Sequence, residues 1–137
     1  MRSIGANEEA DNHVNDAIVL TIPTDSAYRG VASLVLGGLG TRLDLPYERM
    51  DDLQLAVLSM LDASRDDDAS VEINTEDGHV AVSVGPLRDG AENDNGLALV
   101  LTRLTDRVEA ARRDDASWLT VFLARAEAVA STDPTSD

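Results

Sequence analysis

The chain has 137 residues, a length that suits one domain with one hydrophobic core. Apolar residues make up 43% and aromatic residues only 3%, so we expect a core of Leu, Val, Ile and Ala. The net charge of −15 disfavours binding to DNA, RNA or anionic lipid, because their phosphates would be repelled. No apolar run reaches the length of a membrane span. The lack of cysteine excludes disulfides, thiolate catalysis and cysteine-bound zinc.

The N-terminal segment, residues 1–17, is acidic and polar, and it lacks the basic-then-apolar order of a signal peptide. We therefore expect a flexible acidic arm over residues 1–17, a compact domain over residues 18–127 and a disordered tail over residues 128–137. A cytoplasmic location is the default expectation. The acidity itself has three explanations: solubility, an acidic proteome or a basic protein partner.

The first two predicted elements are a strand and a helix. Residues 18–23 alternate moderately and end in proline, and side chains suited to a helix N-cap precede a helix that we expect from about Ala27. Its apolar stripe, expected in the core, consists of Val31, Leu34, Val35 and Leu39. Three glycines, Gly37, Gly38 and Gly40, predict close backbone packing against a neighbouring element rather than a ligand.

The clearest helix start in the sequence is Pro46, because proline suits the first helical turn. We expect this second helix to end before the polar run at residues 64–70. Its apolar stripe consists of Met50, Leu53, Val57, Met60 and Leu61.

Two alternating runs, residues 71–76 and 80–84, flank Asp77-Gly78 and predict a β-hairpin, since both turn residues tolerate positive φ. Residues 85–95 are expected to form a loop, with Gly85-Pro86 as a turn.

A third helix is expected over residues 97–111, with Arg112 and Arg113 suited to its C-terminal end. Residues 118–124 alternate and predict the last strand. The expected order is β-α-α-β-β-α-β. This order predicts the α+β class and a two-layer α/β sandwich with a mainly antiparallel sheet.

The order of elements, together with residues 33–57, resembles the anti-sigma-factor serine/threonine kinases, which have the histidine-kinase-like ATPase fold. Members of that family have a first helix ending in small residues, a short turn, an acidic helix start and a Leu-x-x-Ala-Val core, which is present here at residues 53–57. The resemblance extends from about Ile18 to Arg125. It implies this fold, a magnesium–ATP site and binding of a sigma factor and its antagonist.

The first family motif places a catalytic Glu and a magnesium-binding Asn four residues apart on the second helix. The matching positions here are Ser59 and Ala63, and neither side chain can take the family role. Asp62 is rotated by about 100° from the Asn position, so we expect a solvated carboxylate there.

Two glycine motifs complete the family's site. Where Asp-x-Gly-x-Gly should follow the hairpin, Ser83 replaces the adenine-binding Asp and Gly85 is kept. Where Gly-Leu-Gly-Leu should begin the last helix, the sequence keeps Gly96 but has Ala98. Helix N-termini bind anions, but the acidic residues just upstream would repel a triphosphate.

The combined losses predict a pseudo-kinase without an ATP or magnesium cofactor. Each lost charged contact costs about 1.5–3 kcal/mol, so the dissociation constant should rise by several orders of magnitude. We expect a non-catalytic regulator of the anti-sigma type that binds a sigma factor or an anti-sigma antagonist and that can pair with a second copy. The resemblance, with exposed Tyr and Arg typical of hot spots, assigns the partner surface to Tyr28, Arg29, Ser33 and Gly37.

Two alternatives stay open. One is a divergent serine/threonine kinase that uses Asp62 or Asp89 in place of the lost residues. The other is a sensor or scaffold domain that binds a different ligand.

Other constellations give no support for catalysis or metal binding. His79 is expected at the hairpin turn opposite Glu76, and His13 lies in the arm. The run at residues 66–68 lacks the spacing and distal Glu of a calcium loop. Ser64 and Ser117 have no histidine beside them in sequence.

Overall fold

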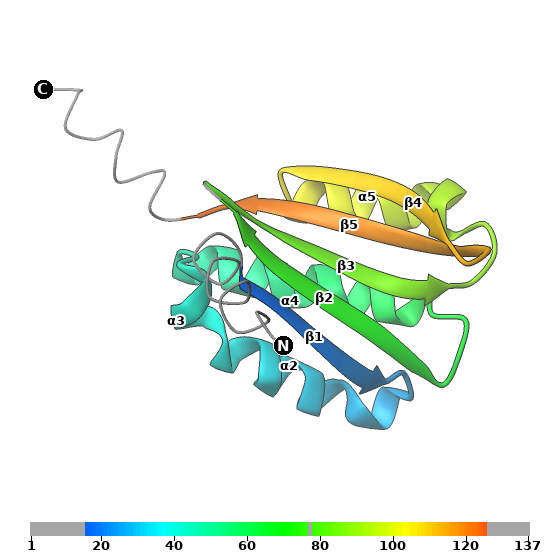
Figure 1. Ribbon diagram of the computed structural model, residues 1–137, viewed down its shortest axis with the longest axis horizontal. Helices are drawn as coiled ribbons and strands as arrows, with labels where there is room; N and C mark the ends of the chain where they lie inside the picture. Colours follow the sequence, from blue (N-terminus) through cyan, green and yellow to red (C-terminus); the bar gives the residue numbers. More distant parts are fainter. Residues whose placement is uncertain (1–15, 77, 126–137) are drawn as a thin grey trace, which may run out of the picture.

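The computed structural model describes residues 16–76 and 78–125 of the chain (Figure 1). Its five strands form one antiparallel sheet in the order β1-β2-β3-β5-β4, and the three longer helices lie on one face of it (Figure 1). The elements are β1 (Asp16–Pro23), η1 (Ser26–Tyr28), α2 (Arg29–Gly38), α3 (Gly40–Leu43), α4 (Tyr47–Asp62), β2 (Asp68–Glu76), β3 (His79–Leu87), η2 (Ala91–Asn93), α5 (Asn95–Leu104), β4 (Arg107–Arg113) and β5 (Ala116–Ala124). The fold is therefore α+β.

The first strand begins at Asp16, two residues inside the range expected to be an arm. Residues 1–15, which include His13, and residues 126–137 lie outside the described part of the chain. Of the helices in the described part, none is both long and apolar enough to span a membrane.

Alternate residues of each strand face the same side of the sheet. Those that face the helices form the core, which lies between the two layers. On the central strands these are fully buried aliphatic side chains such as Val80, Val82 and Val121. The predicted stripe of α4 packs on them, since Met50, Leu53, Val57, Met60 and Leu61 are all buried. Pro46 is the N-cap of α4 and not its first residue.

The hairpin between β2 and β3 is confirmed, with Glu76 opposite His79 in the register and Gly78 at φ 83°. His79 Nε2 lies 2.9 Å from the Glu76 carboxylate, as the sequence predicted for a turn histidine. The strand β3 continues to Leu87 with a register shift after Val84. Gly85 and Pro86 therefore belong to a strand, and the predicted turn at these residues is wrong.

The predicted helix over residues 97–111 is also wrong, because α5 ends at Leu104 and β4 follows. Thr105 ends the helix in an extended conformation, and its hydroxyl donates to the Leu101 carbonyl at 2.7 Å. Asp114 and Asp115 both adopt positive φ and form a two-residue turn that pairs β4 with β5. The true order is β-α-α-α-β-β-α-β-β when the single turn of α3 is included.

The helix α2 is rotated relative to the prediction. Its buried residues are Ala32 and Leu36, whereas Val31 is 53% exposed and Leu34 is 76% exposed. Both sides of this helix are apolar, so spacing alone could not identify the buried one. The expectation that Val31, Leu34 and Val35 belong to the core is therefore wrong, and only Leu39 of that stripe packs against it.

The sheet face opposite the helices carries Trp118, which is nearly buried. A Cβ at Gly85 would lie only 2.3 Å from Trp118 Cδ2, so the indole rests on the glycine backbone. On its other side, the Arg113 guanidinium lies 4.0 Å from the ring centroid. Arg113 Nη1 also donates to both Glu72 carboxylate oxygens at 3.0 Å. These contacts give Gly85 a packing role.

Candidate functional site

The C-terminal half of α4 and the start of α5 enclose a hollow of about 220 Å³. Three of the positions that the sequence predicts to be remnants of a nucleotide site meet in this hollow. Its lining consists of Ser59, Asp62, Ala63, Arg88, Asp94 and Leu97. Small-molecule pockets usually have about 300–1,000 Å³, so the volume of this hollow lies below that range.

The polar groups of α4 in this hollow already have partners within the chain. The Asp62 carboxylate forms an ion pair with Arg29 of α2. The Ser59 hydroxyl donates to the Leu55 carbonyl one helical turn back, at 2.9 Å. Both polar groups therefore have a partner within the chain.

The N-terminus of α5 is capped from within the protein. Asp94 Oδ1 accepts from the Leu97 N–H at 3.0 Å, and Arg88 pairs with the other carboxylate oxygen at 2.5 Å. The backbone hydrogen bond from Leu97 lowers the pKa of Asp94, and the Arg88 charge adds to the effect. A carboxylate thus occupies the place where a helix N-terminus would otherwise attract phosphate.

Gly96 and Ala98 lie exposed on the first turn of α5. Ala98 lines a different hollow, between α5 and the sheet. From α5 and its N-cap, only Asp94 and Leu97 line the first hollow, so Gly96 and Ala98 lie outside its lining.

The remaining two degenerate positions lie elsewhere. Ser83 and Gly85 alternate with the core-facing Val82 and Val84 on β3, so they face the opposite side of the sheet. Ser83 Oγ lies 2.6 Å from the Thr120 hydroxyl, which satisfies it locally. The structure therefore brings together Ser59, Asp62 and Ala63 but separates them from Ser83 and Gly85.

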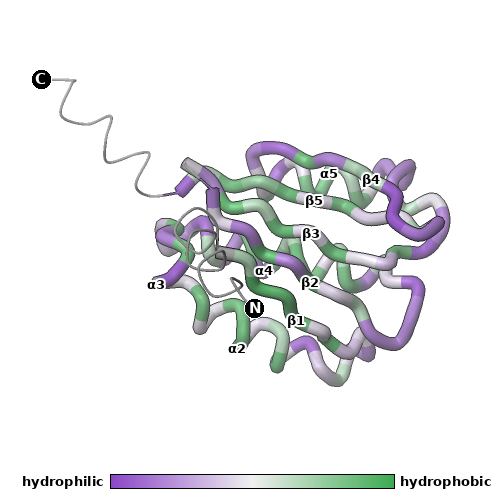
Figure 2. Tube along the Cα trace, in the orientation of Figure 1, coloured by the Kyte–Doolittle hydropathy of each residue, from purple (hydrophilic) through white to green (hydrophobic). Residues whose placement is uncertain are grey.

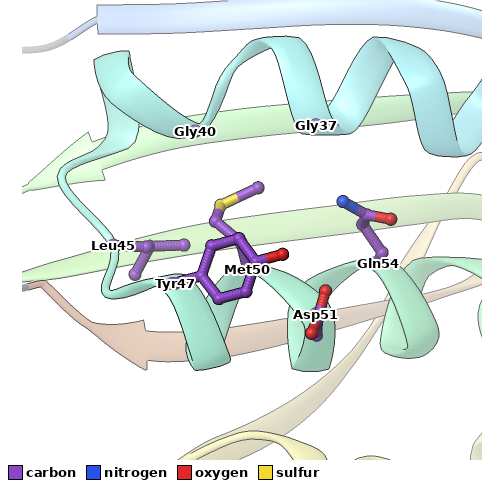
Figure 3. A pocket seen from close by; sticks show the side chains of 7 residues that line it. All are labelled: Gly37, Gly40, Leu45, Tyr47, Met50, Asp51 and Gln54. Atoms are coloured by element: carbon purple, nitrogen blue, oxygen red, sulfur yellow. The ribbon is translucent and has the colours of Figure 1, made fainter.

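A larger hollow of about 390 Å³ lies between α2, α3 and the first half of α4 (Figure 3). Figure 3 shows Met50 and Gln54 extending from α4 toward Gly40 and Gly37. The lining consists of Gly37, Gly40, Leu45, Tyr47, Met50, Asp51 and Gln54. Leu45 and Met50 are buried there, whereas Tyr47 and Asp51 are exposed.

Of the three glycines predicted to pack closely, two contact a neighbouring side chain and one does not. A Cβ at Gly40 would lie 3.4 Å from Met50 Cγ, and one at Gly37 would lie 3.4 Å from Gln54 Nε2. A Cβ at Gly38 would meet no atom within 4 Å.

An exposed apolar surface of the helical layer lies on α2 and its N-cap. We call it the α2 outer face, formed by the N-cap residue Tyr28 and by Val31, Leu34 and Val35, all of which are exposed. Arg29 and Gly37 face α4. Val31 lies two positions after Arg29 and Val35 two positions before Gly37, and two positions on a helix correspond to a rotation of about 200°. Val31 and Val35 therefore point away from α4, and Figure 1 shows that α2 runs along the border of the sheet where β1 lies.

The residues predicted for a partner surface lie on different sides of α2. Tyr28 belongs to the outer face, whereas Arg29 is paired with Asp62, Ser33 is half-buried and Gly37 lines the larger hollow. Helical spacing predicts Val31, Leu34 and Val35 in the core, so they are absent from the predicted partner surface. One available signal was the charge pattern, since residues 30–41 contain no charged side chain in a chain of net charge −15.

The part of the chain that the structure describes contains no metal-binding cluster. No three side chains among its His, Asp and Glu residues are grouped so as to hold a metal ion.

Comparison with known proteins gives a likeness of fold. No family model matches the chain, and no curated protein matches its sequence. One chain in the crystal structure of the SiaB–SiaC complex from Pseudomonas aeruginosa superimposes with a TM-score of 0.51. The match covers 90% of this chain and 98% of that chain, at 12% sequence identity. At this identity the likeness concerns the fold alone, and the chain shares an α+β architecture with that solved structure.

Proposed function

We propose that the chain is a non-catalytic regulatory protein of the anti-sigma type, which binds a protein partner and thereby controls transcription in the cytoplasm. The observation that carries this proposal is the α2 outer face. Four exposed and uncharged residues lie together there, although 27% of the chain is charged. An exposed apolar patch of this kind is typical of a protein interaction site.

The histidine-kinase-like ATPase fold is part of the proposal. Its support is the order of a strand, two longer helices, a hairpin and a further helix, with all three longer helices on one sheet face. The likeness to a chain of the SiaB–SiaC complex agrees with a protein that works by association with other proteins.

Two carboxylates of the smaller hollow already have partners within the chain, and this supports a protein without catalytic activity. Asp62 is paired with Arg29, and Asp94 caps α5. A divergent kinase would use Asp62 or Asp89 for magnesium, but Asp62 is paired with Arg29 and the exposed Asp89 does not line the smaller hollow.

The partner that suits this protein is basic or neutral. An acidic body attracts a basic segment of a sigma factor and repels nucleic acid. Pairing of two copies through the same uncharged face is a second use, and repulsion between two bodies of net charge −15 would weaken it.

The test is co-purification of partners with the tagged protein from its own host. Two variants are compared with the wild type, and we expect opposite results from them. Leu34→Asp places a charge in the middle of the α2 outer face, whereas Leu99→Asp places one on exposed apolar surface of α5. We expect the wild type and Leu99→Asp to recover the same sigma factor or anti-sigma antagonist, and Leu34→Asp to lose it. Recovery of neither class, or undiminished recovery by Leu34→Asp, would contradict the proposal.

A further inference from the structure

The two edges of the sheet differ in charge. The edge strand β4 carries four charged side chains, at Arg107, Glu109, Arg112 and Arg113. The edge strand β1 carries none from residue 17 to its end. Charges on an edge strand oppose pairing with another chain, so β4 is protected, whereas the outer edge of β1 is uncharged and pairs with no strand among the described residues. Figure 2 shows the same contrast, with the middle of β1 hydrophobic and β4 ending in hydrophilic residues.

The hydrogen-bond register identifies the backbone groups of β1 that are not bonded to β2. The Thr24 N–H donates to the Asp67 carbonyl at 2.8 Å, and these residues are opposite each other in the register that pairs Pro23 with Asp68. Bonded pairs alternate along an antiparallel ladder, so the even-numbered residues of β1 bond to β2. The N–H and C=O groups of Ala17, Val19 and Thr21 therefore point away from the sheet.

Pro23 agrees with this assignment. It falls in the outward series, where a residue without an N–H removes no bond to β2. The free edge thus offers outward donors at residues 17, 19 and 21, and it ends at a proline.

The α2 outer face lies alongside this free edge. Val31 and Val35 point away from α4, and α2 follows β1 along the border of the sheet (Figure 1). A strand added next to β1 would bond to its outward groups and would place alternate side chains toward the uncharged α2 surface.

The end of this edge is acidic. Asp25, Asp66, Asp67 and Asp68 are exposed around Pro23, and of these Asp66 is paired with Arg65. A basic residue at the corresponding end of an added strand would meet three further carboxylates.

We propose that β1 accepts an extended segment of the protein partner as a sixth strand, and that this segment alternates in apolar side chains and carries basic residues at the end next to Pro23. The inference rests on the proposed partner binding and names the chemistry that the partner supplies. Main-chain hydrogen bonds give the affinity, and the α2 outer face together with the acidic end gives the selectivity.

The test uses a matched pair of variants at one position. Val19→Pro removes the outward N–H at the centre of the edge and leaves the β1–β2 ladder intact, whereas Val19→Thr keeps the N–H and the branched shape. Thr21→Pro repeats the test at a second outward position if Val19→Pro fails to fold, as judged by circular dichroism and thermal unfolding.

The probes are fluorescein-labelled peptides of alternating Val and Thr, with two Lys or two Glu residues at one end, and fluorescence polarisation measures their binding. We expect the Lys-ended peptide to bind the wild type and Val19→Thr, and to bind Val19→Pro at least about tenfold more weakly. The Glu-ended peptide should be similarly weak. Equal binding to Val19→Pro, preference for the Glu-ended peptide, or no binding of either peptide to the wild type would overturn the proposal.

Two further measurements separate this proposal from other outcomes. If Leu34→Asp abolishes partner recovery from the host but Val19→Pro does not, strand addition is wrong and the partner-binding function stands. If sedimentation shows a wild-type dimer that Val19→Pro dissociates, the occupant of the edge is a second copy, and the assignment to a partner segment is overturned.

Discussion

Replacing Gly85 with alanine tests whether this glycine serves the packing of Trp118. An added Cβ would lie 2.3, 2.6 and 2.7 Å from three indole carbons, so the ring must move by about the difference from an ordinary contact of about 3.5 Å. Overpacking of a core costs about 1–3 kcal/mol. A displaced ring also loses the Arg113 guanidinium that stacks on it, which adds about 0.5–1 kcal/mol.

A loss of this size should lower the melting temperature by roughly 5–15 °C for a domain of this length. Because the chain has a single tryptophan, its fluorescence reports directly on the same site. We expect the emission of Gly85→Ala to shift to longer wavelength as the ring becomes more exposed. The matched control is Gly30→Ala, since a Cβ there would meet no atom within 4 Å and alanine favours a helix. Unchanged melting and emission of Gly85→Ala would refute the packing role.

Two further predictions follow from α2 and α5. Leu36→Ala should lower the free energy of unfolding by about 2–5 kcal/mol, because Leu36 is fully buried. Leu34→Ala should change the same free energy by less than about 0.5 kcal/mol, because Leu34 is exposed. Denaturant titration measures both, and the reverse order would contradict the observed rotation of α2. Asp94→Ala should lower the melting temperature at neutral pH, because the cap of α5 is lost. The pKa of Asp94 is lowered in the folded state, so its contribution is present above the ordinary value of 3.8 and is lost as the pH falls through the folded-state pKa. Melting curves should therefore show the gap between variant and wild type closing in acid, and a gap that stays constant would argue against the cap.

The parts of the fold that the sequence predicts are those with a local signal. The Asp77-Gly78 turn and the stripe of α4 each combine a periodic pattern with a specific residue at the boundary. The turn at Asp114-Asp115 lacks glycine, and the helical spacing of Val108 continued the pattern of α5, so β4 was taken for helix. Aspartate does adopt the left-handed conformation more readily than most residues, and this was the signal that could have indicated the hairpin.

The candidate surfaces depend on contacts that no local pattern contains. Val31 and Ala32 lie side by side in an uncharged helix, and only packing against α4 and the sheet determines which of them is buried. Ser83 was matched to the nucleotide site by its distance from the hairpin, but the alternation of β3 directs it to the other face of the sheet.

The measurement that tests the central claim most directly is a calorimetric titration of the full chain with ATP in the presence and absence of magnesium. With Asp62 paired to Arg29, Asp94 capping α5 and Ala63 at the metal position, we expect no saturable heat at ATP concentrations up to the millimolar range. Magnesium-dependent binding at low micromolar ATP would contradict a non-catalytic regulator and would favour the divergent kinase.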